Sequence, residues 1–219
     1  MPAIWRRDLP PETDTVAADH VFADLVARWR QPHRHYHDLS HLAAMLAVID
    51  RHAGWADEPA VVRLAAWFHD AVYVPRRNDN EEASAALAGS VLRRLGLPYQ
   101  QIDEVIRLVR LTERHHPGPG DRNGELLCDA DLSVLADEPD SYRHYTHRIR
   151  MEYSHVPDAA FRAGRIGVLR QLLAMPTLYH VPELKEAWEE RARTNLNREL
   201  AALAGNSTRG QQNGDDGSA

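Results

Sequence analysis

The chain contains almost no cysteine. Cys128 is the only one among 219 residues, which excludes an internal disulfide bond and makes a reducing, cytoplasmic setting the expectation. Lysine is equally scarce, because Lys185 is the only lysine among 26 basic residues, and codon bias is the simplest explanation. The fold must therefore be held by a packed core, which a chain of this length with 43% hydrophobic residues can provide.

Long apolar runs are also missing. No stretch approaches the roughly 18–20 apolar residues of a membrane span, and residues 1–8 lack the apolar core of a signal peptide. The formal net charge is −6, and there is no basic tail or basic stripe, which argues against non-specific binding of nucleic acid. These absences favour a cytoplasmic protein that does not associate with membranes.

The sequence has no convincing alternating pattern of a β-strand and no internal repeat. Apolar residues recur instead at helical spacing, as in Leu42, Met45, Leu46 and Ile49. We therefore predict an all-α fold: a single compact multi-helix bundle over 1–204, followed by a disordered tail over 205–219 that is rich in Gly, Asn, Ser, Gln and Asp. The predicted helices span about 13–30, 38–53, 59–72, 79–95, 102–109, 126–136, 139–155, 158–174 and 183–204.

A few polar residues lie where helix faces ought to be apolar. His41 sits at the edge of an apolar stripe, and His69 and Asp70 interrupt the most core-like segment of the chain, "AAWFHDAVYVP". Asp131 has aliphatic neighbours one turn away on either side, so it should point into the core, whereas Asp129 should point elsewhere. Burying such groups without partners is costly, so they need either a hydrogen-bond network or a cation.

Two inward histidines and two inward carboxylates on three helices favour the cation. Imidazole together with carboxylate suits Mn, Fe, Co, Ni, Zn or Mg, with magnesium least suited as nitrogen ligands increase. Four such ligands leave coordination positions open for water and substrate, which is what catalysis requires. The expected cofactor is therefore one divalent metal ion.

The order of these residues resembles a known family. His41, then His69-Asp70, then Asp131 is similar to the H…HD…D pattern of the HD-domain superfamily of metal-dependent phosphohydrolases. A closer resemblance is to a small bacterial group of predicted metal-dependent members of that superfamily. The resemblance implies an all-α HD-type bundle in which His41, His69, Asp70 and Asp131 hold one divalent cation. The stretches that carry it are "YHDLSHL" (36–42), "WFHDAVY" (67–73), "DNEEASA" (79–85), "LTERH" (111–115), "CDADLSVL" (128–135), "EYSHVPDAAFRAGRIGVL" (152–169) and "EERARTNLNREL" (189–200).

Two further histidines are candidates for the site. In the resembling group a histidine stands at the place of His115, after a threonine that matches Thr112, which suggests contact with substrate or metal. A histidine at a helix C-terminus also interacts well with the helix dipole, which is the alternative explanation. His37, four residues before His41, is a fifth ligand, a phosphate contact or a cap of the helix start.

The acidic run after the His-Asp pair has two explanations. Asp79 and Glu82 have the spacing of a capping box, which needs no catalysis. Glu81 is not needed for the box, and the family-like "DNE" makes it a candidate general base or water-orienting group.

A phosphate substrate needs positive partners. Arg76 and Arg77 follow the expected metal-binding helix directly, and Arg162 and Arg165, at i and i+3, could form a guanidinium fork for phosphate. Arg34 is a further candidate, and for each arginine a solvated helix face with salt bridges is the alternative.

Three functions are weighed. The first is a metal-dependent phosphohydrolase that cleaves a phosphomonoester or phosphodiester of a small molecule, with a nucleotide expected, by attack of metal-activated water; Asp70, Glu81 and His115 would be the catalytic residues. The second is an HD-fold di-iron oxygenase, disfavoured because its two further histidines should be well separated, whereas His115 and His116 are adjacent. The third is a nucleotide-binding module that keeps the metal without turnover, although all four expected ligands are present.

Overall fold

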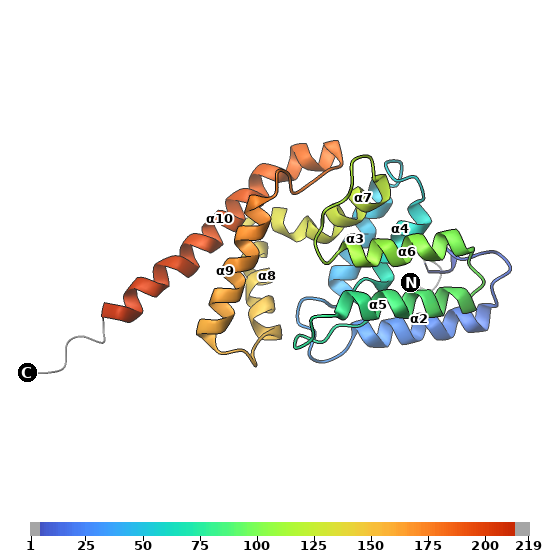
Figure 1. Cartoon of the computed structure of the whole chain (residues 1–219), viewed down its shortest axis with the longest axis horizontal. Coiled ribbons are helices and arrows are strands. Elements are labelled where there is room, and N and C mark those ends of the chain that lie inside the picture. Colours follow the sequence, from blue (N-terminus) through green and yellow to red (C-terminus); the bar gives the residue numbers. More distant parts are fainter. Residues whose placement is uncertain (1–4, 213–219) are drawn as a thin grey trace, which may run out of the picture. The chain divides into compact units, whose positions relative to one another are not determined.

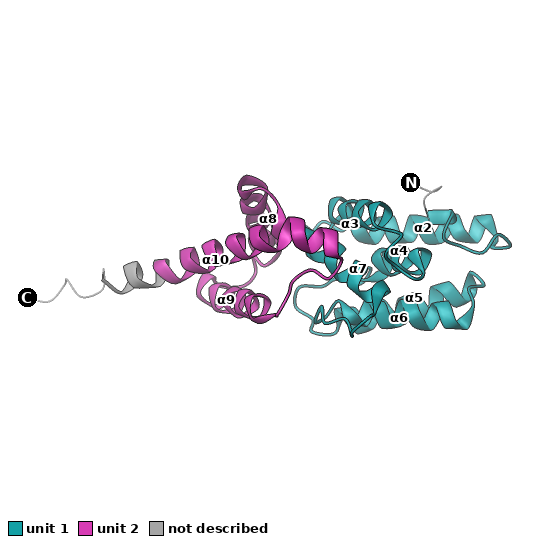
Figure 2. Cartoon of the chain, turned by 90° about the horizontal axis from the view of Figure 1, so that it is seen from above, with its two compact units in different colours: residues 1–133 teal, residues 134–219 magenta. Residues whose placement is uncertain are grey.

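The computed structural model describes residues 5–212, with side chains described for 5–205. Its regular elements within these residues are all helical, which confirms the predicted all-α class. The chain forms two compact units, Met1–Ser133 and Val134–Ala219, called unit 1 and unit 2 below (Figure 2). The single domain expected over 1–204 stays a prediction, because two compact units can still unfold as one cooperative domain.

Unit 1 is a bundle of helices joined by loops (Figure 1). Its helices are α2 (Thr15–Trp29), α3 (Leu39–Arg51), α4 (Pro59–Phe68), α5 (Asn80–Arg94), α6 (Tyr99–Leu111) and α7 (Arg122–Asp131), and the short 3₁₀-helix η1 (Leu132–Ala136) leads from this unit into the next.

Helix α4 is the centre of unit 1. Its sequence PAVVRLAAWF is apolar on every side, and a helix of that kind has to be surrounded by others. Helices α3, α5, α6 and α7 pack around it, and seven of its ten residues are buried. Arg63, its single charged residue, extends to the buried carboxylate of Asp8, with 2.6 Å between Nη2 and Oδ1. The residues that follow α4 therefore emerge from the interior of the unit.

Side-chain caps fix the starts of two helices that carry the expected metal ligands. The carboxylate of Asp38 accepts hydrogen bonds from the backbone N–H groups of Ser40 (2.8 Å) and His41 (3.3 Å), so α3 begins at Leu39. The carboxylate of Asp121 accepts from the N–H of Gly124 at 2.9 Å at the start of α7. Each such cap stabilises its helix by about 1 kcal/mol.

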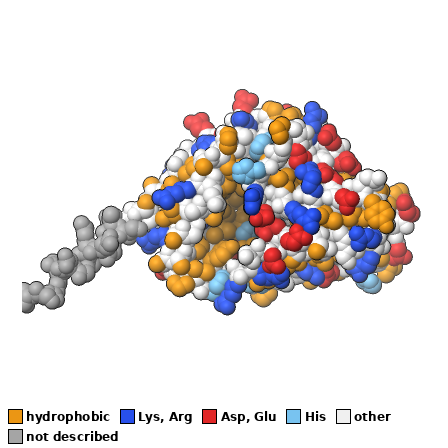
Figure 3. Space-filling model, in the orientation of Figure 1, with side chains coloured by type: hydrophobic (Ala, Val, Ile, Leu, Met, Phe, Trp, Pro, Cys, Tyr) orange, Lys and Arg blue, Asp and Glu red, His pale blue; other side chains and the backbone are white. Residues whose placement is uncertain are grey.

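The capping box expected at the start of α5 is not formed. Asp79 is the N-cap residue, but its side chain makes no capping bond and accepts instead from Arg77 at 2.7 Å. Glu82 pairs with Arg110 of α6 at 2.6 Å. Guanidinium groups within reach compete with the backbone for both carboxylates, which the sequence spacing alone could not reveal. Figure 3 shows Lys/Arg and Asp/Glu side chains interspersed over this face of α5 and α6.

Arg107 joins α6 to the start of α7, and its removal should weaken unit 1 in a pH-dependent way. It donates to Asp121 at 2.7 Å and to Glu104 at 2.8 Å. The hydrogen bond from Arg107 lowers the pKa of Glu104; burial raises the pKa of Asp121, but bonds from Arg107 and Gly124 leave it lowered overall. Because solvent screens a guanidinium that is 45% exposed, we expect Arg107→Met to lower the free energy of unfolding by only about 1 kcal/mol at neutral pH.

The sign of the pH dependence follows from the lowered pKa values. A lowered carboxyl pKa contributes stability above the unfolded-state pKa of about 4, and this contribution disappears as the pH falls through the folded-state value. Urea unfolding of wild type and Arg107→Met should therefore differ at about pH 7 and converge at about pH 3. Arg114→Met is the control, because Arg114 is 81% exposed with only a loose 3.9 Å pair. A deficit of Arg107→Met that persists at low pH would contradict this account.

Unit 2 contains the remaining helices, α8 (Pro139–Glu152), α9 (Asp158–Ala174) and α10 (Pro182–Gln212), of which α9 and α10 pack together. Its interior is partly polar. The carboxylate of Glu199 accepts from the hydroxyl of Tyr142 at 2.6 Å and from Nε of Arg165 at 2.7 Å, and Asn195 donates to the carbonyls of Leu135 and Asp137. These bonds hold α8, α9 and α10 to one another and to the segment that precedes α8.

Helix α10 continues through Gln212, beyond the end expected at 204. The remainder of the disordered tail expected over 205–219, namely 213–219, lies outside the described residues. Within the described part of the chain, no helix combines the length and the apolar character needed to cross a bilayer.

Candidate metal centre

The His-Asp pair lies just beyond the end of a helix, and not within one. Helix α4 ends at Phe68 and His69 is its C-cap, so the helix expected to continue to Val72 stops earlier. The ring Nδ1 of His69 donates to the carbonyl of Ala66 at 2.9 Å, in place of helix continuation. Neighbouring residues of a helix point about 100° apart, so leaving the helix here allows both His69 and Asp70 to face one place.

The segment before α3 is fastened to the His-Asp segment by side-chain to backbone bonds. Nε1 of Trp29 donates to the carbonyl of Trp67 at 3.1 Å, and Nε2 of His33 donates to the carbonyl of Tyr73 at 2.8 Å. These bonds start from two points of the segment that leads to His41. They fix the distance between the part of the chain that carries His41 and the part that carries His69.

Arg34 reinforces the same connection. Its guanidinium donates to the carbonyl of His37 at 3.0 Å and to that of Ala71 at 3.5 Å, and it lies over the rings of Trp29 and Tyr73 at 5.3 and 5.4 Å. The side chain is buried, so the phosphate contact considered from the sequence is replaced by a role in holding these two segments together.

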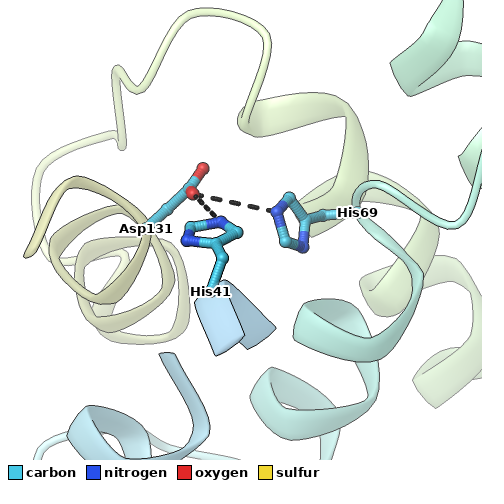
Figure 4. A group of neighbouring side chains, drawn as sticks. All are labelled: His41, His69 and Asp131. Carbon is cyan, nitrogen blue, oxygen red and sulfur yellow. Dashed lines mark ion pairs between the residues drawn. The ribbon is translucent and has the colours of Figure 1, made fainter. Parts of the chain in front are cut away.

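His41, His69 and Asp131 come together from α3, the end of α4 and the end of α7. One ligand atom of each lies within 4.8 Å of the others, so this group could hold a metal ion (Figure 4). Oδ1 of Asp131 is 3.1 Å from Nε2 of His41 and 3.7 Å from Nε2 of His69. The sequence predicted that these three residues share a site, and the structure brings them together.

The two imidazole nitrogens that face Asp131 are buried and have no hydrogen-bond partner. These atoms are Nε2 of His41 and Nε2 of His69; the first is close to the carboxylate without meeting the geometry of a hydrogen bond. The bond from Nδ1 of His69 to Ala66 places its proton on Nδ1 in the neutral ring, which leaves a lone pair on Nε2. Buried nitrogens without partners beside a carboxylate fit a first-row divalent cation bound through N and O atoms.

Asp70 lies beside this group. Its Oδ2 is 3.4 Å from Nε2 of His69, and the residue is 8% exposed. It is not one of the three residues whose ligand atoms lie close together, so its place as the fourth ligand stays a prediction.

The electrostatics of the cluster call for a positive charge. Burial lowers the pKa of His69, but the carboxylates of Asp70 and Asp131 outweigh this and raise it to about 9. Burial raises the carboxyl pKa values, yet His69 brings that of Asp70 down to about 2, and His69 with His115 and His41 holds that of Asp131 well below its usual range. For His41, burial prevails and lowers the pKa. The two carboxylates thus favour a positive charge at Nε2 of His69, which is where a cation would be held.

The two histidines expected around the cluster are both near it. Nε2 of His115 is 2.8 Å from Oδ2 of Asp131, so His115 contacts the cluster through this carboxylate. His37 precedes the N-cap of α3, and so does not share a helix face with His41, although their ring centroids are 5.8 Å apart. Its own ring lies against that of Tyr73, tilted by 33°, with 4.4 Å between the centroids. His116, by contrast, is exposed, and its ring bonds to the carbonyl of Arg114.

The candidate base and the loop arginines expected to contact phosphate make no direct bond to the cluster in the described part of the chain. Glu81 is half-buried in the first turn of α5, and within the described residues no hydrogen bond or ion pair joins it to the histidines. Arg77 is exposed and paired with Asp79, and Arg76 is exposed in the same loop. Roles for Glu81, Arg76 and Arg77 therefore stay predictions.

The arginine fork expected on α9 is not formed. Arg165 is buried in unit 2 and directs two nitrogens at Glu199, at 2.7 and 3.0 Å. The guanidinium is thus committed to a buried carboxylate from α10, a partner that helical spacing within α9 cannot reveal. Arg162 is half-buried on the same helix and stays a candidate by sequence alone.

One expectation about α7 is wrong, and one useful residue was missed. Asp129 is fully buried, although its position on the helix suggested that it points away from the core. Asn80 was not singled out, yet its side chain accepts from the N–H of Val74 at 3.0 Å and donates to the carbonyl of Val74 at 3.1 Å. This pair of bonds closes the loop that follows the His-Asp segment, and the only sequence signal for it is an asparagine beside the helix start.

Comparisons with protein-family models, with curated proteins and with solved structures found no match for this chain. The resemblance to the HD-domain superfamily accordingly rests on the residues named above.

Proposed function

We propose that the protein is a metal-dependent phosphohydrolase of the HD type, acting on a phosphate ester of a small molecule. The observation that carries the proposal is the pair of buried, unpartnered Nε2 atoms of His41 and His69, which face the carboxylate of Asp131. A buried polar network without a cation would satisfy these atoms among themselves, because an unmade hydrogen bond in the interior costs about 1–3 kcal/mol.

His41, His69 and Asp131, with Asp70 as a fourth ligand, would hold the cation. When bound, a divalent cation of this kind polarises a phosphoryl oxygen and lowers the pKa of water. Asp70 is the residue beside the cluster that would take part in the chemistry. Its Oδ2 lies 3.4 Å from Nε2 of His69, and its low pKa keeps the carboxylate ionised at neutral pH, where it can bind a cation or orient water.

The surrounding residues would bind and orient the substrate. The half-buried ring of His37 lies against Tyr73 close to the cluster, where it can contact a phosphate oxygen. Arg76 carries a positive charge in the loop that Asn80 closes after the His-Asp segment. Glu81 is proposed as the group that accepts a proton from the attacking water, which needs it to approach the cluster when substrate binds.

The test is turnover. Wild type loaded separately with Mn, Fe(II), Co, Ni, Zn or Mg is assayed against p-nitrophenyl phosphate, bis-p-nitrophenyl phosphate and a set of nucleotides. We expect hydrolysis with at least one metal, and a loss of about 100-fold or more in kcat/KM for Asp70→Asn, since a charged group beside the reacting centre is removed. Asp24→Asn is the control, because Asp24 is exposed on α2 and pairs with Arg28, and neither residue is a candidate for the site. The proposal fails if metal-loaded wild type hydrolyses none of these esters, or if Asp70→Asn retains full activity.

A further inference from the structure

His115 has an unusual backbone conformation. Its φ is +53°, and it is the only residue other than glycine with a positive φ in the described part of the chain. The left-handed region brings Cβ too close to the backbone for most residues, and glycine occupies it at much lower cost. Glycine serves such positions elsewhere in this unit, at Gly96 and Gly120. A histidine at a glycine-like position therefore calls for a compensating interaction of its side chain.

The turn itself does not require histidine. Helix α6 ends at Leu111, and the N–H of His115 donates to the carbonyl of Leu111 at 2.9 Å, which closes the last turn through the backbone alone. Thr112 stabilises the same turn, since its hydroxyl donates to the carbonyl of Val109 at 2.8 Å. Any residue that tolerates the left-handed conformation would complete this turn.

The side chain of His115 meets one particular atom. Its Nε2 lies 2.8 Å from Oδ2 of Asp131, while the other oxygen, Oδ1, faces His41 and His69. The two oxygens of this carboxylate therefore have different contacts. One contacts His115, and the other faces the two unpartnered histidine nitrogens. The helix backbone does not fix the rotation of a carboxylate about its terminal bond, so the contact with His115 selects which oxygen faces the two histidines.

We propose that His115 is a positioning residue that fixes the rotation of the Asp131 carboxylate, so that Oδ1 is presented to a cation held by His41 and His69. This inference rests on the metal centre of the proposed function. It replaces the catalytic or ligand role considered for His115 from the sequence, since its Nε2 is directed at Oδ2 and not at the histidine nitrogens. Partners that orient metal-binding carboxylates in this way change metal affinity by about 10- to 100-fold when removed.

Two substitutions separate this role from a purely structural one. Asparagine tolerates the left-handed conformation well, but its side chain is too short to reach Oδ2. Glutamine tolerates that conformation less well, but its amide nitrogen extends about as far as Nε2 of histidine and can donate the same hydrogen bond. If His115 positions Asp131, His115→Gln keeps metal affinity and His115→Asn loses it. If His115 only completes the turn, His115→Asn keeps metal affinity and His115→Gln loses it.

The experiment measures the dissociation constants of Mn²⁺, Co²⁺ and Zn²⁺ by competition with a chromogenic chelator, for wild type and both variants, with folding checked by circular dichroism of the metal-free proteins. We expect His115→Asn to bind about 10- to 100-fold more weakly than wild type and His115→Gln to stay within about threefold. Equal affinity of His115→Asn and wild type would overturn the inference, as would a loss in His115→Gln as large as in His115→Asn. Failure of wild type to bind any of these ions would instead overturn the metal centre itself.

Discussion

Asp131→Asn is expected to lose the metal ion while keeping the fold. Asp131 supplies the carboxylate that lies 3.1 Å from His41 and 3.7 Å from His69, with His115 on its other oxygen at 2.8 Å. Asparagine has nearly the same shape, so packing is preserved, but the negative charge that would bind a cation is removed. Because a group that only orients a ligand is worth about 10- to 100-fold in affinity, loss of the ligand charge itself should exceed about 100-fold.

The measurement is metal content per chain by mass spectrometry, with all proteins purified in the same way under gentle conditions. Wild type should carry about one equivalent of a divalent transition metal and Asp131→Asn less than about a tenth of that. Asp24→Asn is the control, because Asp24 is an exposed carboxylate of α2 that pairs with Arg28 one turn away. Wild-type occupancy in Asp131→Asn would show that the metal, if any, is bound elsewhere.

Metal removal should produce the second large effect, a lower melting temperature. An ion that binds only the folded chain stabilises it by about 4 kcal/mol when present at about a thousand times its dissociation constant. For a chain of this size each kcal/mol corresponds to about 2–4 °C, so we expect saturating metal to raise Tm by about 8–16 °C over chelator-treated protein. All residues of the cluster belong to unit 1, so we expect the shift in the transition in which unit 1 unfolds.

Differential scanning calorimetry in metal and in chelator tests this shift directly. Asp131→Asn, measured in the same two buffers, should show no difference between them, which separates site binding from a general effect of divalent salt. A wild-type Tm that is unchanged by chelation and by re-addition of each metal would mean that His41, His69 and Asp131 form a buried polar network and nothing more.

Helices were predictable from sequence because their signals are local. Proline at the first turn marks the starts of α4, α8 and α10, and apolar spacing gives most of their lengths. The end of α4 was less predictable. Apolar spacing continues through Val72, whereas the helix stops at Phe68, where the ring of His69 bonds to Ala66. The spacing of apolar residues cannot reveal that a side chain, here the ring of His69, takes a backbone carbonyl that the next turn of the helix would use.

The core of the site was predictable for a similar reason. His41 and Asp131 are polar residues set among apolar neighbours of amphipathic helices, so the sequence predicts that both face inward; His41 is buried and the side chain of Asp131 is 14% exposed. The contacts of Arg165 and Asn80 were not predictable from the sequence. Their partners lie on another helix or in a loop, so helical periodicity does not connect the two positions. Which polar side chains pair over long sequence distances can be read only from the three-dimensional structure.

The way the cluster draws on distant parts of the chain has a kinetic consequence. His41, His69 and Asp131 close two long loops when one ion joins them, and the single cysteine, Cys128, has no partner with which to make a covalent link. A bound ion would act as a removable cross-link, and covalent links over loops of such length are worth about 3–5 kcal/mol. The three groups come from α3, the end of α4 and the end of α7, so we expect the ion to bind late in folding, once these helices have packed. It would then slow unfolding more than it speeds folding.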